Sequence, residues 1–405
     1  MDTVIDKSNN LPKDWKWVKL GDVLSVSSGK GIKVNSLQGG KYAVYGGNGL
    51  NGYHSEYLLE EPKLIIGRVG VKCGVMHITK PKSWVTDNAL IVEPKNDAFD
   101  IQFLKLKLGF ENLNKLSVST AQPVISGSKI YAYEISLPPK LTQQAIVFKI
   151  EELFSELDKG IENLRAAQQQ LKTYRQSVLK WAFEGKLTIE NVKEGELPKG
   201  WKNVSITELA EKNKHALKAG PFGSSLKKEF YVAKGYKIYG QEQVISNDAF
   251  YGDYYVNEEK YHELSSCKIK PFDILISLVG TVGKVLLLPK NCQAGIINPR
   301  LIKISLDRKV YSPKFFKYYF ESSFVKSFYG AETRGTTMDV LNLGIIKTIP
   351  FPLCTVKEQN KIIQEIESRL SVADKMEESI TQSLQQAEAL RQSILKRAFE
   401  GKLLQ

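Results

Sequence analysis

Two long segments of the chain carry apolar residues at alternating intervals of four and three positions, between charged and amide side chains. This spacing is typical of a coiled-coil seam rather than of the wider apolar face of a globular helix. Because one helix cannot bury such a stripe alone, we expect the two helices to pair, antiparallel because each follows its own globular segment. The expected seam residues are Ile150, Phe154, Leu157, Ile161, Leu164, Leu171, Val178, Ile366, Leu370, Ile380, Leu384 and Ile394.

The segments that precede these helices show a different pattern. Short β-branched and aromatic runs alternate with Gly, Asn and Pro, which indicates strands with tight turns plus one or two helices. We therefore expect an α+β protein with two pseudo-symmetric globular domains separated by a pair of long antiparallel coiled-coil helices. The expected boundaries are 1–140 for the first domain, 141–187 for the first helical segment, 188–196 for a linker, 197–354 for the second domain and 355–405 for the second helical segment.

An internal repeat supports this division. Residues 175–187 read RQSVLKWAFEGKL and residues 391–403 read RQSILKRAFEGKL, with eleven identities in thirteen positions at an offset of 216. Upstream, YAVYG from Tyr42 matches YKIYG from Tyr236, and Asn88 aligns with Asn298. Measured between matching landmarks, Leu197 to Phe351 in the second domain is 28 residues longer than Leu11 to Leu137 in the first, so we expect the two domains to bind related but different ligands.

Signals for the helix ends agree with these boundaries. Thr355 and Glu358 form a capping-box pattern at the start of the second helix, and Gly185 and Gly401 stand where a left-handed C-terminal cap is expected. Gln168 and Glu377 interrupt the apolar seams. They either fix the register of the helices or face a partner, or the seam simply tolerates them.

The net charge of +13 lies in the globular domains. Residues 1–140 carry +5 and residues 188–350 carry +7, whereas 141–187 and 351–405 carry +1 and 0. Two basic domains held apart by a neutral spacer favour duplex DNA as the ligand, because DNA presents repeated phosphates and spaced half-sites. The absence of a long apolar run and of a signal-peptide pattern predicts a cytoplasmic protein, and the scattered cysteines predict no disulfide framework.

Motifs that resemble catalytic sites have simpler interpretations. Residues 47–52 match G-x-G-x-x-G, but no amphipathic helix follows, and residues 279–284 lack the length of a phosphate loop. We expect turns at both places. The two Glu-Gly-Lys sequences at 184 and 400 are expected to terminate helices, and the spacing of Cys73 and His77 predicts no zinc site. We therefore expect a non-catalytic chain.

The order and duplication of these motifs resemble the DNA-specificity subunits of type I restriction-modification systems over essentially the whole chain. The residues that carry the resemblance are Leu11-Pro12 with Trp15, Leu197-Pro198 with Gly200-Trp201, the domain endings 136–139 and 349–352, Gln143, Glu358-Gln359, 220–224, 86–90, 335–337 and the two Glu-Gly-Lys-Leu sequences. Trp15 and Trp201 are expected to anchor their domains by packing.

The resemblance implies a specificity subunit with two target-recognition domains, each reading one half of a bipartite asymmetric DNA sequence. The helices would set the spacing and dock two modification subunits, which methylate adenine N6 with S-adenosylmethionine. A restriction subunit in the same complex would use ATP and Mg²⁺ to translocate and cleave DNA, so no cofactor is expected in this chain. The alternatives are a stand-alone nucleic-acid-binding repressor with the same duplicated layout and a purely structural coiled-coil scaffold.

Basic and amide side chains in the glycine-rich loops are the candidates for DNA contacts, because they can bond both phosphates and base edges. In the first domain they are Lys30, Lys33, Asn48, Asn51, Arg68 and Lys72. In the second they are Lys218, Ser224, Ser225, Lys227, Lys228, Gln241, Gln243, Lys284 and Arg334.

Overall fold

The structure is a computed structural model, and it describes residues 11–33, 37, 39–70, 72–116, 123–193, 195–279, 281–332 and 341–404. It contains two compact units. The first unit comprises residues 1–165 and 381–405, and the second comprises residues 166–380. Each unit therefore combines one globular domain with half of each long helix. Among the described residues, no helix is long and apolar enough to cross a membrane.

The first unit is built on two small sheets and a short ribbon. The order β2-β8-β5-β6 forms an antiparallel sheet, β4-β3-β7 forms a mixed sheet, and β1 pairs with β9. The strands are β1 Lys16–Lys19, β2 Leu24–Ser28, β3 Tyr42–Gly46, β4 Gly49–His54, β5 Leu64–Gly67, β6 Met76–Ile78, β7 Trp84–Val85, β8 Ala89–Pro94 and β9 Glu134–Leu137. The helices are α1 Leu20–Val23, α2 Ile101–Phe110, the 3-10 helix η2 Leu113–Leu116 and α3 Gly127–Tyr131.

The uninterrupted apolar run of β5 follows from burial on both of its faces. Successive side chains of a strand point to opposite sides. Leu64 and Ile66 pack into the main core with α2, whereas Ile65 packs into a second cluster with Ala43 and Val85 of the other sheet. The central strand therefore joins the two sheets into one domain.

The second unit repeats this plan with additions. Its antiparallel sheet has the order β11-β18-β15-β16, its mixed sheet has the order β12-β14-β13-β17, and β10 pairs with β19. The strands are β10 Lys202–Val204, β11 Leu217–Ala219, β12 Tyr231–Val232, β13 Tyr236–Tyr239, β14 Tyr255–Val256, β15 Ile274–Ser277, β16 Val285–Leu287, β17 Gly295–Ile297, β18 Leu301–Ile304 and β19 Phe351–Leu353. The helices are α5 Ile206–Leu209, η3 Gly223–Leu226, η4 Lys228–Phe230, α6 Gln241–Ser246, α7 Glu258–Glu263, η5 Ser265–Cys267, α8 Pro313–Phe320, α9 Ser323–Glu332 and α10 Leu343–Thr348.

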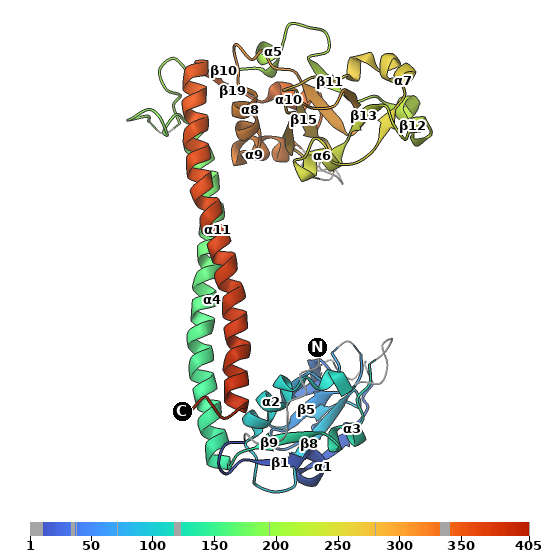
Figure 1. Cartoon of the computed structure of the whole chain (residues 1–405), viewed down its shortest axis with the longest axis vertical. Helices are drawn as coiled ribbons and strands as arrows, with labels where there is room; N and C mark the ends of the chain where they lie inside the picture. Colours follow the sequence, from blue (N-terminus) through green and yellow to red (C-terminus); the bar gives the residue numbers. More distant parts are fainter. Residues whose placement is uncertain are drawn as a thin grey trace. The chain divides into compact units, whose positions relative to one another are not determined.

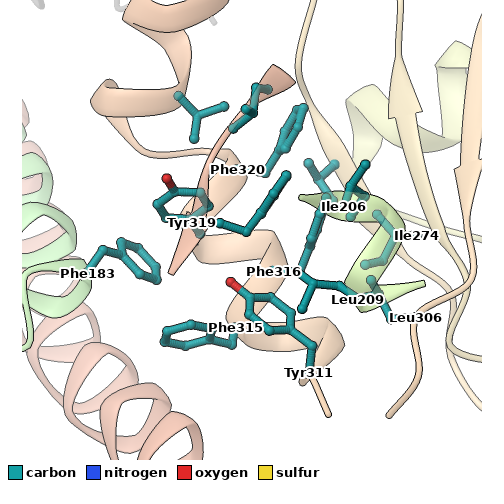
Figure 2. Close-up of a cluster of buried hydrophobic side chains, with 14 of the residues drawn as sticks. Phe183, Ile206, Leu209, Ile274, Leu306, Tyr311, Phe315, Phe316, Tyr319 and Phe320 are labelled. Atoms are coloured by element: carbon teal, nitrogen blue, oxygen red, sulfur yellow. The ribbon is translucent and has the colours of Figure 1, made fainter. Parts of the chain in front are cut away.

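An aromatic cluster forms the main core of the second unit. Phe315, Phe316 and Phe320 of α8 are fully buried, and Figure 2 shows them between the sheet residue Ile274 and Phe183 of the long helix. The Phe183 ring lies 5.1 Å from that of Phe315. Phe399 makes the equivalent contact in the first unit, with its ring 5.8 Å from Phe103 of α2. In both units, the end of a long helix is thus part of the domain core.

The long helices are α4 Lys140–Phe183 and α11 Val356–Phe399, each of 44 residues (Figure 1). They pair within each unit through equivalent ion pairs. Arg175 bonds Asp374 at 2.6 Å and Glu377 at 2.8 Å in the second unit, and Arg391 bonds Asp158 in the first. Since Arg391 and Asp374 stand 216 positions after Arg175 and Asp158, these pairs fit an antiparallel arrangement of two copies of one helix. The polar seam residue Glu377 forms an intramolecular ion pair with Arg175, which favours a role in fixing the register of the two helices.

All of the predicted seam residues are buried or half-buried. Ile150, Val178 and Ile366 are fully or almost fully buried, and Leu171, Ile380 and Ile394 are buried as well. The remaining predicted positions are half-buried: Phe154, Leu157, Ile161, Leu164, Leu370 and Leu384. Trp15 and Trp201 pack against the cores of their own units, which confirms the anchoring role predicted for them.

The helix ends confirm the two predicted C-terminal caps and the Thr355 half of the predicted capping box. The Glu358 N–H donates to Thr355 Oγ1 at 3.3 Å. Gly185 and Gly401 have φ values of 76° and 73°, and the N–H groups of Lys186 and Lys402 bond back to Trp181 and Arg397, both at 2.8 Å. The Glu-Gly-Lys sequences are therefore helix terminators.

A buried glutamine joins each long helix to its domain in the same way. Gln143 Nε2 donates to the carbonyls of Ala98 and Pro138, and its Oε1 accepts from the Asp100 N–H at 2.8 Å. Gln359 repeats this pattern with the carbonyls of Val310 and Cys354 and the Ser312 N–H at 2.7 Å. Both glutamines are fully buried, so their amides link the first turn of the long helix to the start of α2 or α8.

Substitution of either glutamine by alanine should destabilise its own unit by about 3 kcal/mol, because three backbone groups lose their partner in a buried site. Hydrogen exchange of backbone amides in each unit measures this effect. Gln144→Ala, at the exposed neighbouring position, is the matched control and should change stability by less than about 0.5 kcal/mol. Equal protection in Gln143→Ala and Gln144→Ala would contradict the anchoring role.

Candidate nucleic-acid interface

Several strand ends meet at one edge of the first unit, where the two sheets adjoin. The Gly29 N–H after β2 bonds the Ala89 carbonyl at 3.1 Å, the Thr86 N–H bonds the Tyr45 carbonyl of β3 at 2.8 Å, and the Arg68 N–H after β5 bonds the Asn88 carbonyl at 2.9 Å. We call the residues Gly29, Lys30, Arg68 and Asn88 the first strand-end surface.

The second unit has the same arrangement. The Gly220 N–H after β11 bonds the Leu301 carbonyl at 2.9 Å, the Asn298 N–H bonds the Tyr239 carbonyl of β13 at 2.9 Å, and the Leu278 N–H after β15 bonds the Arg300 carbonyl at 3.0 Å. The second strand-end surface comprises Gly220, Gln241, Asn298 and Arg300.

Glycine is required at one strand end of each surface. A Cβ at Gly29 would lie 2.2 Å from the Thr86 carbonyl oxygen, and one at Gly220 would lie 1.8 Å from the Asn298 carbonyl oxygen. Neither distance is possible for a real side chain. The glycines therefore allow the polar ends of different strands to gather at one edge.

The hydrogen bonds correct one alignment made from the sequence. The sequence pairs Asn88 with Asn298, but Thr86 and Asn298 make the equivalent bonds to β3 and β13. Asn88 and Arg300 are likewise equivalent, because their carbonyls accept from the residues that follow β5 and β15. The sequence alignment was wrong by two residues. It matched Asn88 of Asp-Asn-Ala with Asn298 of Asn-Pro-Arg because asparagine is the only residue type that the two motifs share.

Within each unit, side chains of the strand-end surface form hydrogen bonds with one another or with neighbouring residues. Arg68 Nη1 donates to Ser28 Oγ at 3.4 Å in the first unit. In the second, Gln241 Nε2 donates to Ser277 Oγ at 2.9 Å, and Arg300 Nη1 donates to Gln241 Oε1 at 3.4 Å. Arg300 is exposed, so its remaining guanidinium donors point to solvent and can serve a ligand.

Two of the predicted contact residues of the first domain, Lys30 and Arg68, belong to the first strand-end surface. Lys30 belongs to the surface itself, and its carbonyl accepts from the Trp84 indole at 2.8 Å. Arg68 is half-buried, and the other predicted residues are exposed: Lys33 after β2, Asn48 in the β3–β4 turn, Asn51 in β4 and Lys72 after β5.

The predicted residues of the second domain are more dispersed. Gln241 lies in the strand-end surface, and Lys284 is exposed at the start of β16. Lys218 is half-buried in β11, Ser225 is half-buried in η3, and the exposed Lys227 and Lys228 follow it. Lys227 pairs with Glu229 at 3.6 Å. Ser224 belongs to η3, and Arg334 lies outside the described residues.

Gln243 has an interior position. It is fully buried, its Oε1 accepts from the Gly240 N–H at 2.7 Å, and its Nε2 donates to the Tyr251 carbonyl at 2.7 Å. Its amide is thus engaged within the domain, where it supports the loop after α6.

Sequence reasoning did not select Arg300, although the structure places it in the second strand-end surface. The Asn-Pro-Arg motif was considered only for its asparagine. The signal that could have identified Arg300 is its position directly before β18, which matches that of Asn88 directly before β8.

The expected turns are present where glycine motifs resemble cofactor loops. Residues 47 and 48 form the tight turn of the β3–β4 hairpin, and the described residues between β15 and β16 form a turn in the second unit. Neither leads into a helix that could point its N-terminus at a phosphate.

Comparison with known proteins supports the duplicated plan. The type I restriction modification DNA specificity domain matches residues 12–166 and 198–388. The EcoBI specificity subunit of Escherichia coli is 23% identical, with 97% of this chain and 87% of that protein covered. The MjaVIII specificity subunit of Methanocaldococcus jannaschii is 22% identical, with 97% and 94% covered.

Solved structures show the same fold. A chain from a study of complex assembly and conformational transition in a type I restriction-modification system superimposes with a TM-score of 0.74 at 16% identity, covering 98% of this chain and all of that one. The HsdS subunit from Thermoanaerobacter tengcongensis gives a TM-score of 0.59 at 17% identity, with 98% and 99% covered. The two matched segments, the two equivalent strand-end surfaces and the paired long helices together show that this chain belongs to the specificity subunits of type I restriction-modification systems.

Proposed function

We propose that each unit reads one half of a bipartite, asymmetric DNA sequence through its strand-end surface. The observation that carries this proposal is the repetition of one backbone arrangement with different side chains. The same backbone hydrogen bond joins Arg68 to Asn88 in the first unit and Leu278 to Arg300 in the second, where the Arg300 side chain also bonds Gln241. Since arginine and amide side chains form bidentate bonds with guanine and adenine, different sets on one scaffold provide two different half-site specificities.

The distribution of charge supports DNA as the ligand. The globular domains hold +12 of the net charge of +13, whereas the helical segments hold +1. Phosphate attraction would therefore act on the domains, and the helices would remain free for protein contacts.

The long helices are proposed to bind the modification subunits. They expose several large apolar side chains that a soluble helix pair would normally bury, and exposed apolar groups mark interaction sites. These are Leu141, Phe148, Tyr174, Trp181, Val372, Met376 and Leu390, of which Leu141 is 81% and Phe148 72% exposed. Methylation with S-adenosylmethionine, and ATP- and Mg²⁺-dependent translocation and cleavage by a restriction subunit, would then take place in the partners.

Arg68→Ala and Arg300→Ala form a matched pair that tests independent reading. Each variant should lose about 1–3 kcal/mol of preference, roughly 5- to 150-fold, at positions in one half of the site and keep the other half. The measurement is selection of bound sequences from a pool of duplexes with a randomised centre, using the chain with the subunits that co-purify with it. A loss of preference in both halves from either single substitution contradicts independent reading.

Co-purification also distinguishes the proposed function from a stand-alone repressor, which gains no support from the comparisons. A specificity subunit should purify with a methyltransferase subunit, and Phe148→Asp should weaken that association. Wild-type protein that binds a specific duplex but retains no methyltransferase would overturn the proposed assembly.

A further inference from the structure

The second unit carries an additional loop next to its strand-end surface. In the first unit, Gly47 and Asn48 alone connect β3 to β4, whereas α6 and residues 247–254 connect the equivalent strands β13 and β14. We call residues 248–254 the aromatic loop. It accounts for part of the greater length of the second domain and belongs to no feature that the two units share.

Buried side chains hold the backbone of the aromatic loop in place. Lys237 Nζ donates to the carbonyls of Phe250 at 3.0 Å and Gly252 at 2.7 Å, and Gln243 Nε2 donates to the Tyr251 carbonyl between them. Lys237 is 1% exposed and Gln243 is fully buried. Three consecutive carbonyls are thus fixed from inside the domain.

The buried ammonium indicates how strongly this conformation is imposed. Burial lowers the pKa of Lys237, while the carboxylates of Asp253, Asp248 and Glu242 raise it. Burial of a charge is costly unless several partners compensate for it. In the first unit, Ala43 occupies the position equivalent to Lys237 in the aligned strands, and no such loop follows the strand.

Held in this way, the loop presents aromatic side chains to solvent. Phe250 is 47%, Tyr251 55% and Tyr254 53% exposed. Aromatic side chains on a fixed backbone lose little conformational entropy on binding and offer large apolar surfaces. Three exposed aromatic residues within five positions therefore indicate a ligand.

The aromatic loop is continuous with the second strand-end surface. It follows α6, whose first residue is Gln241, the partner of Arg300. The Tyr254 ring lies 5.4 Å from the Tyr231 ring. The pKa of Tyr231 is raised by burial, by Glu242 and by Tyr254, and it is lowered by Arg300. These three side chains therefore lie around Tyr231. A duplex bound at Arg300 would therefore meet the aromatic loop.

The charge around the loop favours contact with bases rather than with phosphates. Glu242, Asp248 and Asp253 lie close to Lys237, and carboxylates repel the phosphate backbone. Base edges, in contrast, offer apolar groups, above all the thymine methyl in the major groove. Resting on the proposed function of the strand-end surface, we propose that Phe250 and Tyr251 of the aromatic loop read thymine-containing positions in the half-site of the second unit by apolar contact.

Alanine substitution of Phe250 or Tyr251 tests this inference. In the full chain with its co-purified subunits, each variant should bind the duplex selected by the wild type about tenfold more weakly. Since no phosphate contact is removed, the slope of log K against log salt concentration should not change. Base preference should be lost at one or two positions of the second half-site only. Tyr57→Ala removes an exposed tyrosine of the first unit. It is the control and should retain the wild-type base preference in the second half-site.

Replacement of thymine by deoxyuridine in the second half-site should weaken wild-type binding and leave the variants unaffected, because only the methyl group is removed. Lys237→Met should reproduce the loss of preference without touching DNA, and far-ultraviolet circular dichroism checks that it folds. The proposed role of the loop is overturned if both alanine variants keep the base preference of the wild type. It is also overturned if the variants lose a co-purifying protein subunit but keep their base preference. If the wild-type protein selects no DNA sequence, the proposed function of the strand-end surfaces is contradicted, and the proposal for the aromatic loop falls with it.

Discussion

Exchange of residues 197–354 for the corresponding domain of another specificity subunit should replace one half of the recognised DNA sequence and preserve the other. Each base pair that no longer matches costs about 1–3 kcal/mol. Three altered pairs would therefore lower affinity for the original site by at least roughly a hundredfold. The physical reason is that all members of the second strand-end surface lie inside this segment, together with one of the unit's two core clusters and most of the other, which the ends of the long helices complete. Sequencing of the methylated sites in a host that carries the exchanged gene measures the outcome.

The reciprocal exchange provides the control. Replacement of residues 14–136 should change the other half of the site, because Gly29, Arg68 and Asn88 lie inside that segment. If either exchange alters both halves, the two surfaces do not act independently, and the repeated hydrogen-bond pattern would not reflect separate reading.

Phe316→Ala should cause the largest loss of stability, about 3–5 kcal/mol in the second unit. The Phe316 ring is fully buried among the aromatic side chains of α8 (Figure 2). It lies 5.3 Å from the rings of both Phe320 and Phe351, so its removal leaves a cavity between α8 and β19. Hydrogen exchange of the β15 amides reports the effect, because β15 lies in the same core.

Phe222→Ala is the matched substitution at the surface, since this side chain is 84% exposed. It should change the protection of β15 by less than about 0.5 kcal/mol. Protection of the first unit at β5 should be unchanged in both variants. Equal effects of Phe316→Ala and Phe222→Ala on β15 would show that the aromatic cluster is not the core of this unit.

The helical part of the fold could be predicted closely from the sequence. The seam from Ile150 and its copy from Ile366 gave helices within a few residues of α4 and α11. A coiled-coil repeat depends on local spacing, and eleven identities fixed the correspondence of the two copies. The buried Gln143 and Gln359 could be located at the helix starts, but not their bonds, because the partners come from distant parts of the chain.

The candidate interface was harder to predict because it depends on strands that are distant in sequence. Lys30, Arg68 and Gln241 were identified from their glycine-rich surroundings. Gln243, only two residues from Gln241, points inward because α6 turns it toward the loop carbonyls. Arg300 was missed because a misalignment by two residues hid its equivalence with Asn88. Residue type and loop composition therefore identified three members of the two surfaces, and the backbone hydrogen bonds identified the others.

The buried glutamines at the helix starts have a mechanical consequence. Gln143 and Gln359 each join the first turn of a long helix to two other backbone segments of the same unit, and Phe399 and Phe183 insert the opposite helix ends into the same cores. A domain held at both points cannot swivel on its helix as on a flexible joint. Torque applied to the helix by a bound protein would be transmitted to the strand-end surface, so that each recognition domain turns with the helices that it grips.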